Sequence, residues 1–357
     1  LPDTAEANAL REQMLKKGDS NEAMQSAVDT CQALYGEAPL LDGIGVCFPD
    51  VVIDDQIVGG ETYKTRGIRN ASADYESEFF KLSSLQQLLL QQCKPEGKVH
   101  LSNDGSLAAY TAAVELAHSA EADSVVSGVF AHTLGTELGT GWIDETGEIP
   151  QIPLEVYNCI IDLGNHPARA YHELDARSVN NFNTSLSGTL QKYCSQSGAY
   201  RLALRFFEAK APAQYADLFD KGFLEHKDGG IFVRQTPSDM RKPLLEHLMR
   251  LASEGDAAAE EIFREIGEYL AVTFEETEWM LAPRSRARIL FGRFVKHKRC
   301  FDLMQTGAAA RNDVRFVAGD GTLAFTPVML ELKRDPVHTV AQFGQAVGAA
   351  YFAASQL

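Results

Sequence analysis

The segment at residues 129–142 constrains the fold of this chain more than any other, and it reads Val-Phe-Ala-His-Thr-Leu-Gly-Thr-Glu-Leu-Gly-Thr-Gly-Trp. Its first residues are apolar, as expected for a buried strand, and residues 135–141, rich in glycine and threonine, are expected to form a loop. Glycines let a backbone approach a ligand and direct amide N–H groups toward an anion, and threonine hydroxyls add donors. A tight β-hairpin explains the segment by itself equally well, because strand–turn–strand patterns with glycine are common.

A second polar segment lies upstream at residues 99–106, Val-His-Leu-Ser-Asn-Asp-Gly-Ser. Residues 99–101 are expected to form a short strand that carries Asn103 and Asp104 at its carboxyl end. A helix is predicted at residues 106–120, and a further strand at residues 124–132 runs into the glycine–threonine segment. Alternating strands and helices indicate an α/β architecture, in which ligands bind at the carboxyl ends of strands. Both polar segments occupy that position.

The remaining segments predict the same class. Strands are expected at residues 41–48 and 288–291 and a hairpin at residues 51–58, because these apolar runs are bounded by glycine or proline. Residues 95–97, Pro-Glu-Gly, are expected to form a turn. The spacing of apolar residues predicts helices at residues 75–92, 187–207, 241–253, 256–281 and 336–354.

The charge of the chain excludes some classes of partner. With 357 residues the chain is long enough for about two domains, and its net charge is −16 at pH 7. No basic surplus exists to bind a phosphate backbone, so we expect no nucleic-acid partner. No apolar run is long enough for a transmembrane helix, so no membrane partner is expected. The six cysteines are scattered without a CxxC pair, which favours reduced thiols and a cytoplasmic protein.

Several motifs occur in the order in which they stand in the ROK family (repressor, open reading frame, kinase), which comprises sugar kinases and sugar-sensing regulators. Residues 103–109, Asn-Asp-Gly-Ser-Leu-Ala-Ala, resemble the family's Asn-Asp-Ala-Asn-Ala-Ala, and residues 133–141 resemble its Leu-Gly-Thr-Gly-Ile-Gly-Gly-Gly phosphate loop. Weaker resemblances lie at residues 43–50, 154–158, 187–195, 252–259 and 344–350.

The resemblance implies an α/β, two-domain actin-like ATPase (ribonuclease H-like) fold of the sugar-kinase type, with a helix-rich second domain. Residues 1–123 plus 336–357 would form a smaller α/β domain that lacks its first strands. Residues 124–335 would form a larger α/β domain with helical insertions. Dimers are frequent in the family, so a homodimer is expected.

The resemblance also assigns roles to polar residues. Asp104 would be the general base that takes a proton from the sugar hydroxyl, and a carboxylate at a strand end suits that chemistry. Asn103, Asp104, Glu155, Asn158 and Gln191 would bind the sugar. Alternatively, Asp104 is a helix N-cap, and Glu155 and Gln191 are polar residues of the surface that contact no sugar.

The same resemblance implies a nucleotide site for ATP and Mg²⁺ at Gly135, Thr136 and Gly292. Two residues depart from the family pattern there. Glu137 stands where the family has glycine, and a carboxylate beside phosphates would repel them unless it points away or helps to hold Mg²⁺. Phe291 replaces one glycine of the turn near adenosine.

The family's structural zinc ligands are replaced in this chain. Phe182, Thr184 and Thr189 stand at the cysteine positions, and Asn158 stands at the histidine position. This set of side chains cannot build a zinc site, so no structural zinc is expected and no metal-ligating residue is assigned.

Two functions remain open. The first is an ATP-dependent sugar kinase that transfers the γ-phosphoryl group to a hydroxyl of a hexose or related sugar. The second is a catalytically impaired, kinase-like sugar-binding sensor, which Glu137 and Phe291 favour. The family's first phosphate loop, Asp-x-Gly-Gly-Thr-Lys, has no counterpart before Leu41; we expect it to lie upstream of Leu1, the alternative being that this half of the nucleotide site is lost.

Overall fold

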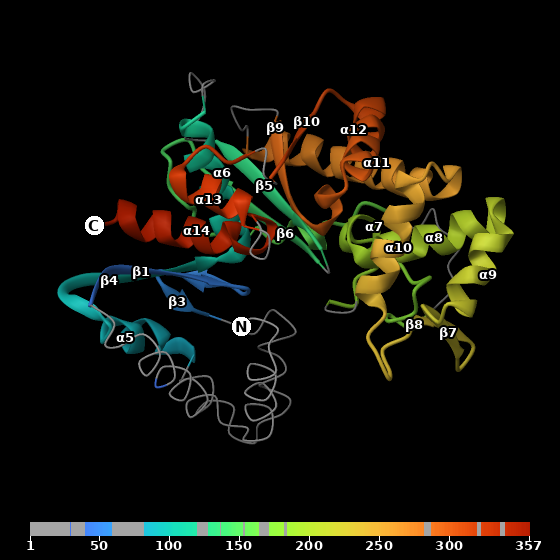
Figure 1. Cartoon of the computed structure of the whole chain (residues 1–357), viewed down its shortest axis with the longest axis horizontal. Helices are drawn as coiled ribbons and strands as arrows, with labels where there is room; N and C mark the ends of the chain where they lie inside the picture. Colours follow the sequence, from blue (N-terminus) through green and yellow to red (C-terminus); the bar gives the residue numbers. More distant parts are fainter. Residues whose placement is uncertain are drawn as a thin grey trace.

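A four-stranded sheet with the strand order β10-β9-β5-β6 lies at the centre of the computed structural model (Figure 1). Its strands are β5 (Val129–Leu134), β6 (Leu138–Ile143), β9 (Ala287–Gly292) and β10 (Arg315–Ala318). β10, β9 and β5 run parallel, and β6 returns antiparallel to β5. The parallel strands are joined by helical segments, as expected for an α/β protein.

The structure describes residues 29, 40–58, 82–119, 128–135, 137–152, 154–163, 171–181, 184–281, 287–319, 323–335 and 340–357. Predictions for residues 59–81 and 120–127 therefore lie outside the described residues. The elements not introduced elsewhere are α5 (Leu85–Leu90), α9 (Pro212–Asp220), β7 (Leu224–Lys227), β8 (Gly230–Val233), α13 (Pro327–Arg334) and the short 3₁₀ helices η1 (Val156–Asn158) and η2 (Arg293–Lys296).

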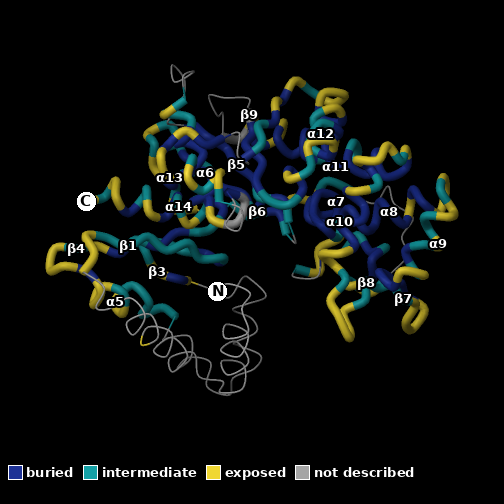
Figure 2. Tube along the Cα trace, viewed as in Figure 1, coloured by how far each residue is buried: buried dark blue, intermediate teal, exposed yellow. Residues whose placement is uncertain are grey.

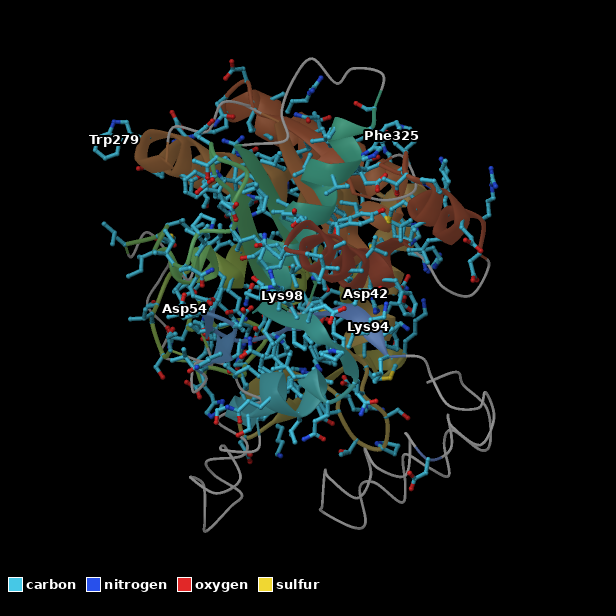
Figure 3. The ribbon with its side chains drawn as sticks, turned by 90° about the vertical axis from the view of Figure 1, so that its left-hand side faces the viewer. Asp42, Asp54, Lys94, Lys98, Trp279 and Phe325 are labelled. Carbon is cyan, nitrogen blue, oxygen red and sulfur yellow. The ribbon has the colours of Figure 1, made fainter. Side chains whose placement is uncertain are left out.

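A second, two-stranded sheet pairs β1 (Leu41–Phe48) with β4 (Cys93–Asn103) in parallel. The register jumps from Leu41 opposite Cys93 to Gly43 opposite Lys98, so the predicted turn at residues 95–97 is instead a bulge inside a longer strand. An exposed ion pair joins the two strands, with Lys94 Nζ 2.6 Å from Asp42 Oδ1 (Figure 3). The predicted hairpin is confirmed as β2 (Val52–Ile53) paired with β3 (Gln56–Ile57).

Two helices, α6 (Asp104–Ala117) and α14 (Val340–Ser355), connect the two sheets. Their apolar residues share one core with strand residues of the central sheet; this core includes Leu107, Ala112, Ile143, Ile289 and Ala349. Helix α14 also lies directly on β1, where a Cβ atom on Gly45 would fall 1.8 Å from the carbonyl oxygen of Ala349. Only glycine permits this distance between the two backbones.

The other half of the molecule is mainly helical. Helices α7 (Gln191–Cys194), α8 (Gln196–Lys210), α10 (Arg241–Ser253), α11 (Ala257–Leu281) and α12 (Lys298–Arg311) surround the largest core. Figure 2 shows that the inward sides of these helices are buried. The core includes Leu202, Leu248, Phe263, Ile266 and Met304. At the far end of α11, Trp279 is 85% exposed and projects from the surface (Figure 3).

Several sequence predictions are confirmed. The helix predicted at residues 241–253 has those bounds, and those at 256–281 and 336–354 correspond to α11 and α14. The pattern missed α9, the β7–β8 hairpin, α12, β10 and α13, which lie largely between residues 196 and 335. The expected domain division remains a prediction, since α6 contacts both sheets.

Two further findings concern the expected cellular context. No helix in the described part of the chain is both long and apolar enough to cross a membrane. The five cysteines within the described ranges, Cys47, Cys93, Cys159, Cys194 and Cys300, are free thiols. Cys31 lies outside the described residues.

Candidate active site

The glycine–threonine segment forms a β-hairpin. Strand β5 pairs with β6 from Val129 opposite Ile143 to Leu134 opposite Leu138, so only residues 135–137 form the turn. Within this turn the Gly135 amide donates a 3.1 Å hydrogen bond to the carbonyl of Glu137. The prediction of a loop through residue 141 was therefore wrong, because residues 139–141 are part of β6. Gly135 remains at the turn, and Thr136 lies outside the described residues.

The glycines of β6 place the first turn of α6 against the hairpin. A Cβ atom on Gly141 would lie 1.9 Å from the carbonyl oxygen of Gly105, and one on Gly105 would lie 2.6 Å from that of Thr140. Neither position can therefore carry a side chain without moving the backbone. Because both residues are glycines, the first turn of α6 packs directly against β6. This packing holds Asp104 beside the hairpin.

The helix N-cap is Asn103. Its Oδ1 accepts a 2.8 Å hydrogen bond from the Gly105 amide, and its Nδ2 donates a 2.9 Å hydrogen bond to the carbonyl of Asp50. Asp104 is the first helical residue, and its Oδ1 accepts from the same Gly105 amide at 2.9 Å. The alternative interpretation of Asp104 as the N-cap is thus wrong by one residue. An acidic side chain in the first turn is also favoured by the helix dipole.

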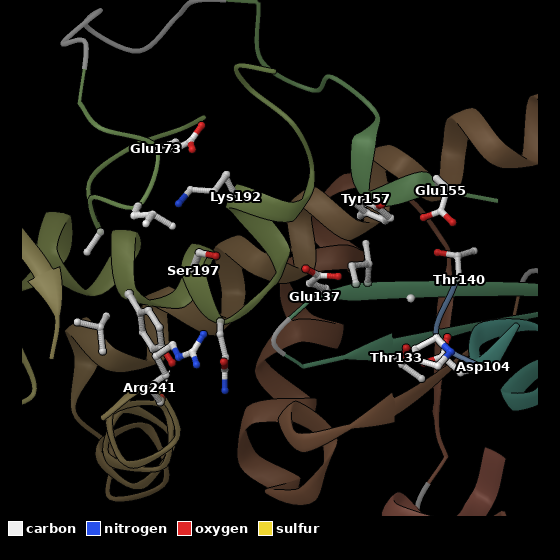
Figure 4. Close-up of a pocket in the computed structure, with 18 of the residues that line it drawn as sticks. Asp104, Thr133, Glu137, Thr140, Glu155, Tyr157, Glu173, Lys192, Ser197 and Arg241 are labelled. Atoms are coloured by element: carbon white, nitrogen blue, oxygen red, sulfur yellow. Dashed lines mark hydrogen bonds between the residues drawn. The ribbon is translucent and has the colours of Figure 1, made fainter. Parts of the chain in front are cut away.

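Two cavities meet at Asp104. The larger has a volume of about 1350 Å³ and the smaller about 300 Å³. Both are lined by the same four residues, Asp104, Thr133, Glu137 and Gln196. Figure 4 shows Asp104 and Thr133 at one end of the larger cavity and Glu137 nearer its middle. A group bound in one cavity can therefore face a group bound in the other at Asp104.

Glu155 lies in the wall of the larger cavity close to other carboxylates. Burial raises its pKa, a hydrogen bond from Tyr157 lowers it, and the charges of Asp50, Asp104 and Glu137 raise it further. This end of the larger cavity is thus acidic and partly shielded from water. Carboxylates in such a place accept hydrogen bonds from sugar hydroxyls well, and they repel anionic groups.

Asn158 and Gln191 do not line either of the two cavities. Gln191 is fully buried, and its Oε1 accepts a 2.6 Å hydrogen bond from Asn181 Nδ2. Asn158 lies in η1, and its Oδ1 is buried without a hydrogen-bond partner among the described residues. Their contact with a sugar therefore remains a prediction, because Gln191 is enclosed by protein and the half-buried Asn158 lines neither cavity.

The smaller cavity brings together Gly135 and Gly292, the two described residues of the predicted nucleotide site. Gly292 has a φ of +96°, and a Cβ atom there would lie 2.4 Å from the carbonyl oxygen of Leu134. Its backbone conformation thus requires glycine, and the absence of a side chain leaves the strand ends open to a ligand. Phe291 and Glu137 also line this cavity, so both departures from the family pattern lie at its wall.

Sequence reasoning missed Arg293, which lines the smaller cavity directly after the Gly292 turn. Its Nη1 is 3.7 Å from Glu246 Oε1 and has no hydrogen-bond partner within the described ranges. A guanidinium in this position can bind a phosphate oxygen. The signal available in the sequence was an arginine immediately after the glycine that ends a strand.

Residues of the helical half complete the larger cavity, and no sequence motif indicates them. They come from α7, α8, the β7–β8 hairpin and the start of α10; those with polar or aromatic side chains include Lys192, Tyr200, Lys227, Phe232 and Arg241. The cavity therefore extends from the acidic end near Asp104 to a second end that contains cations.

Metal binding is not established by the arrangement of side chains. Within the described ranges, no group of three or more histidine, cysteine, aspartate or glutamate side chains is placed to hold a metal ion. Mg²⁺ commonly binds through one or two carboxylates together with substrate phosphates, so such a site requires the nucleotide to complete it. The expectations of a Mg²⁺ ion and of no structural zinc both remain predictions.

The fold is shared with proteins of known structure, although no protein-family model and no curated sequence matches the chain. The ROK family glucokinase of Streptomyces griseus, in complex with glucose and AMPPNP, aligns with a TM-score of 0.56 and 16% identity over 94% of this chain and 88% of its own. A Listeria monocytogenes protein proposed to be an N-acetylmannosamine kinase aligns with a TM-score of 0.51 and 13% identity, over 94% of this chain and 87% of its own. A ROK family transcriptional regulator, a homologue of the Escherichia coli MLC protein, aligns with a TM-score of 0.50 and 12% identity, over 98% of this chain and 72% of its own.

These likenesses establish the fold. The chain has the actin-like ATPase fold in the form found in ROK sugar kinases and regulators, which confirms the fold predicted from the sequence motifs. Because the same fold serves both kinases and a regulator, the activity must be argued from the site.

Proposed function

We propose that this chain is a member of the ROK family and acts as an ATP-dependent sugar kinase. It would transfer the γ-phosphoryl group of ATP to a hydroxyl of a hexose or related sugar. One observation carries this proposal: Asp104 lies where a larger cavity, suited to a sugar, meets a smaller cavity lined by the glycine turns at Gly135 and Gly292. A phosphoryl transfer needs its acceptor and donor to meet at one general base.

The sugar would bind at the acidic end of the larger cavity. Asp104 would accept the proton of the attacking hydroxyl, and Glu155 would accept hydrogen bonds from other hydroxyls. Asn103 also lines this cavity, but both ends of its carboxamide already bond to backbone groups of the protein. Its proposed role is therefore to position Asp104 and the loop at Asp50.

The phosphates of ATP would bind in the smaller cavity, where the proposed residues are Gly135, Thr136 and Gly292. Arg293 would add a positive charge there, opposing the carboxylate of Glu137. A Mg²⁺ ion bound with the nucleotide would neutralise phosphate charge, and Asp104 and Glu137 are the carboxylates of the smaller cavity that could contact it. The Streptomyces griseus structure, with glucose and AMPPNP bound, supports two adjacent ligands in this fold.

The test is an ADP-release assay on the full-length protein over a panel of hexoses and amino sugars. We expect turnover with at least one sugar. Asp104→Ala should abolish it while changing sugar affinity by less than about tenfold, roughly 1.4 kcal/mol, because the base acts on the transferred proton and not on the whole ring. Asp302→Ala, on the exposed surface of α12, is the matched control and should retain activity.

A specific observation keeps the second function open. Glu137 lines both cavities, so its charge faces the position proposed for the γ-phosphate. A sensor that binds sugar without phosphorylating it would tolerate such a carboxylate. Sugar binding with no turnover for any sugar of the panel would favour this function over the kinase.

A further inference from the structure

Lys192 is a buried lysine in the wall of the larger cavity. It lies in α7, is 3% exposed, and extends toward the part of the cavity where Glu173 lies (Figure 4). Among the described residues its ammonium group makes no hydrogen bond and no ion pair, and its carbonyl accepts a bond from Arg201 Nε. The side chain is therefore almost fully removed from water without a partner of its own.

The surroundings of Lys192 disfavour its charge but do not remove it. Burial lowers its pKa to about 8, and the nearby charge of Arg201 adds to this, whereas Asp175 acts in the opposite direction. At pH 7 the ammonium group is therefore still mostly protonated. Desolvated charges interact strongly with an opposite charge that reaches them, because little water screens them.

The other cations of the cavity wall are already neutralised or hydrated. Arg177 binds Asp175 through two hydrogen bonds, Nε to Oδ1 at 3.0 Å and Nη2 to Oδ2 at 2.7 Å. Arg241 likewise holds Asp239, with Nη2 2.6 Å from Oδ2. Lys227 is on the exposed strand β7. Of the cations that line the described part of this cavity, Lys192 is thus the buried one that makes no ion pair, although Asp175, whose carboxylate Arg177 binds, and Glu173 lie on the same side of the cavity.

The stem of Lys192 is enclosed by protein and its ammonium group opens to the cavity, where an anionic ligand could neutralise a charge that the protein pairs with no described carboxylate. We propose that Lys192 forms an anion subsite and that the sugar bound by this protein carries a carboxylate or a phosphate. This inference rests on the proposed function, because it names the class of sugar that the same cavity takes.

The distribution of charge fixes the orientation of such a ligand. Asp104, Glu137 and Glu155 make one end of the cavity acidic. The other end contains carboxylates as well, but it also contains the cations of the wall, so an anionic group is repelled at the first end and can be neutralised at Lys192. The hydroxyl to be phosphorylated then faces Asp104. The volume of about 1350 Å³ exceeds the roughly 300–1,000 Å³ of ordinary small-molecule sites, so an acidic disaccharide also fits the space.

The test is calorimetric titration of the full chain at pH 7 without ATP, using pairs of sugars in which one member is neutral and the other carries a carboxylate or a phosphate. The pairs are glucose with glucuronate, glucose with glucose 6-phosphate, and a neutral disaccharide with the same disaccharide oxidised to a uronate. We expect at least one acidic member to bind more than tenfold more tightly than its neutral partner. The uronate and phosphate arms distinguish the two sources of the anion.

Lys192→Met should reduce this preference to less than about threefold, through weaker binding of the acidic member of the pair. The exposed Lys298→Met on α12 removes the same charge far from the cavity and should keep the preference. Lys192→Met should also raise the unfolding temperature of the unliganded chain, because a buried charge is removed. A structural role for Lys192 would instead lower it.

The outcomes separate the inference from the function on which it rests. If neutral sugars bind and no acidic sugar binds more tightly, or if Lys192→Met keeps the preference, the anion subsite is refuted and the kinase proposal stands. If no sugar of either kind binds, the proposed function itself fails.

Discussion

The half-buried Glu155 and the buried Lys192 have opposite charges in the wall of the same cavity, and each has a pKa shifted toward its neutral form. Burial is the main cause in both residues. Groups held in this way stabilise a ligand more than they stabilise the empty protein. At the scale of single residues, the cavity is thus arranged for a polar ligand with both donors and acceptors.

Glu155→Gln should raise the unfolding temperature at pH 7 more than at pH 4. The folded-state pKa of Glu155 is raised above its usual value, so its contribution to stability is present at low pH and is lost as the pH rises through the folded-state pKa. The neutral amide of glutamine does not ionise, so the variant avoids this loss of stability at pH 7. Thermal unfolding at the two pH values measures it, with the exposed Glu148→Gln as control. An equal change at both pH values would contradict the assignment.

Glu137→Gln should strengthen the binding of metal-free ATP by about tenfold. Removing one like charge near the phosphates is worth ~1–2 kcal/mol at the effective dielectric of a partly buried site. Titration of ATP with and without Mg²⁺ provides the measurement. A gain without metal together with a loss of MgATP affinity would assign Glu137 to the metal. Unchanged affinity in both conditions would show that the nucleotide binds elsewhere.

At the scale of elements, the position of Asp104 depends on the contact between α6 and the β5–β6 hairpin. Gly105 and Gly141 touch through their backbones, and Asn103 caps the helix and bonds to the loop at Asp50. The candidate base is therefore held by two glycines and an N-cap, none of which needs to touch a ligand.

Gly141→Ala should destabilise the chain by ~1–3 kcal/mol and reduce turnover, because its Cβ atom would displace the first turn of α6. Denaturant unfolding and the ADP-release assay measure the two effects. Gly43→Ala on β1 is the matched control, since its Cβ atom would lie no closer than 3.4 Å to any other atom. Full activity in Gly141→Ala would show that the position of Asp104 does not depend on this contact.

At the scale of the whole molecule, the larger cavity is built from segments far apart in the sequence. Its wall includes residues near Asp50, the start of α6, the β5–β6 hairpin, α7–α8 and the β7–β8 hairpin (Figure 1). A ligand that fills it contacts both the sheets and the helical half. Binding should therefore couple to the stability of the entire fold.

A sugar that binds at one hundred times its Kd should stabilise the folded chain by about 2.7 kcal/mol. Because the ligand contacts both halves, we expect the unfolding temperature to rise in a single transition. Scanning calorimetry with and without the sugar tests this. A shift confined to one of two resolved transitions would show that the halves unfold independently and that the ligand binds one of them.

The sequence alone determined the α/β class, the principal strands and long helices, and the two polar segments at strand ends. Local signals suffice for these features, because hydrophobic periodicity and glycine positions are properties of neighbouring residues. The same signals mistook the bulge at residues 95–97 for a turn and extended the turn of the hairpin into β6. The order of the motifs favoured an anion cradle over a plain hairpin; the structure shows the hairpin, and anion binding by its turn remains a prediction.

The tertiary structure decided which side chains share a cavity. Asp104 and Glu155 face the same space, whereas Gln191 is enclosed beside Asn181, although motif alignment assigned all three to the sugar. Lys192, the next residue along α7, lines the cavity instead. Which neighbour faces a ligand depends on how a helix packs against the rest of the fold, and that orientation results from long-range contacts that no local pattern encodes.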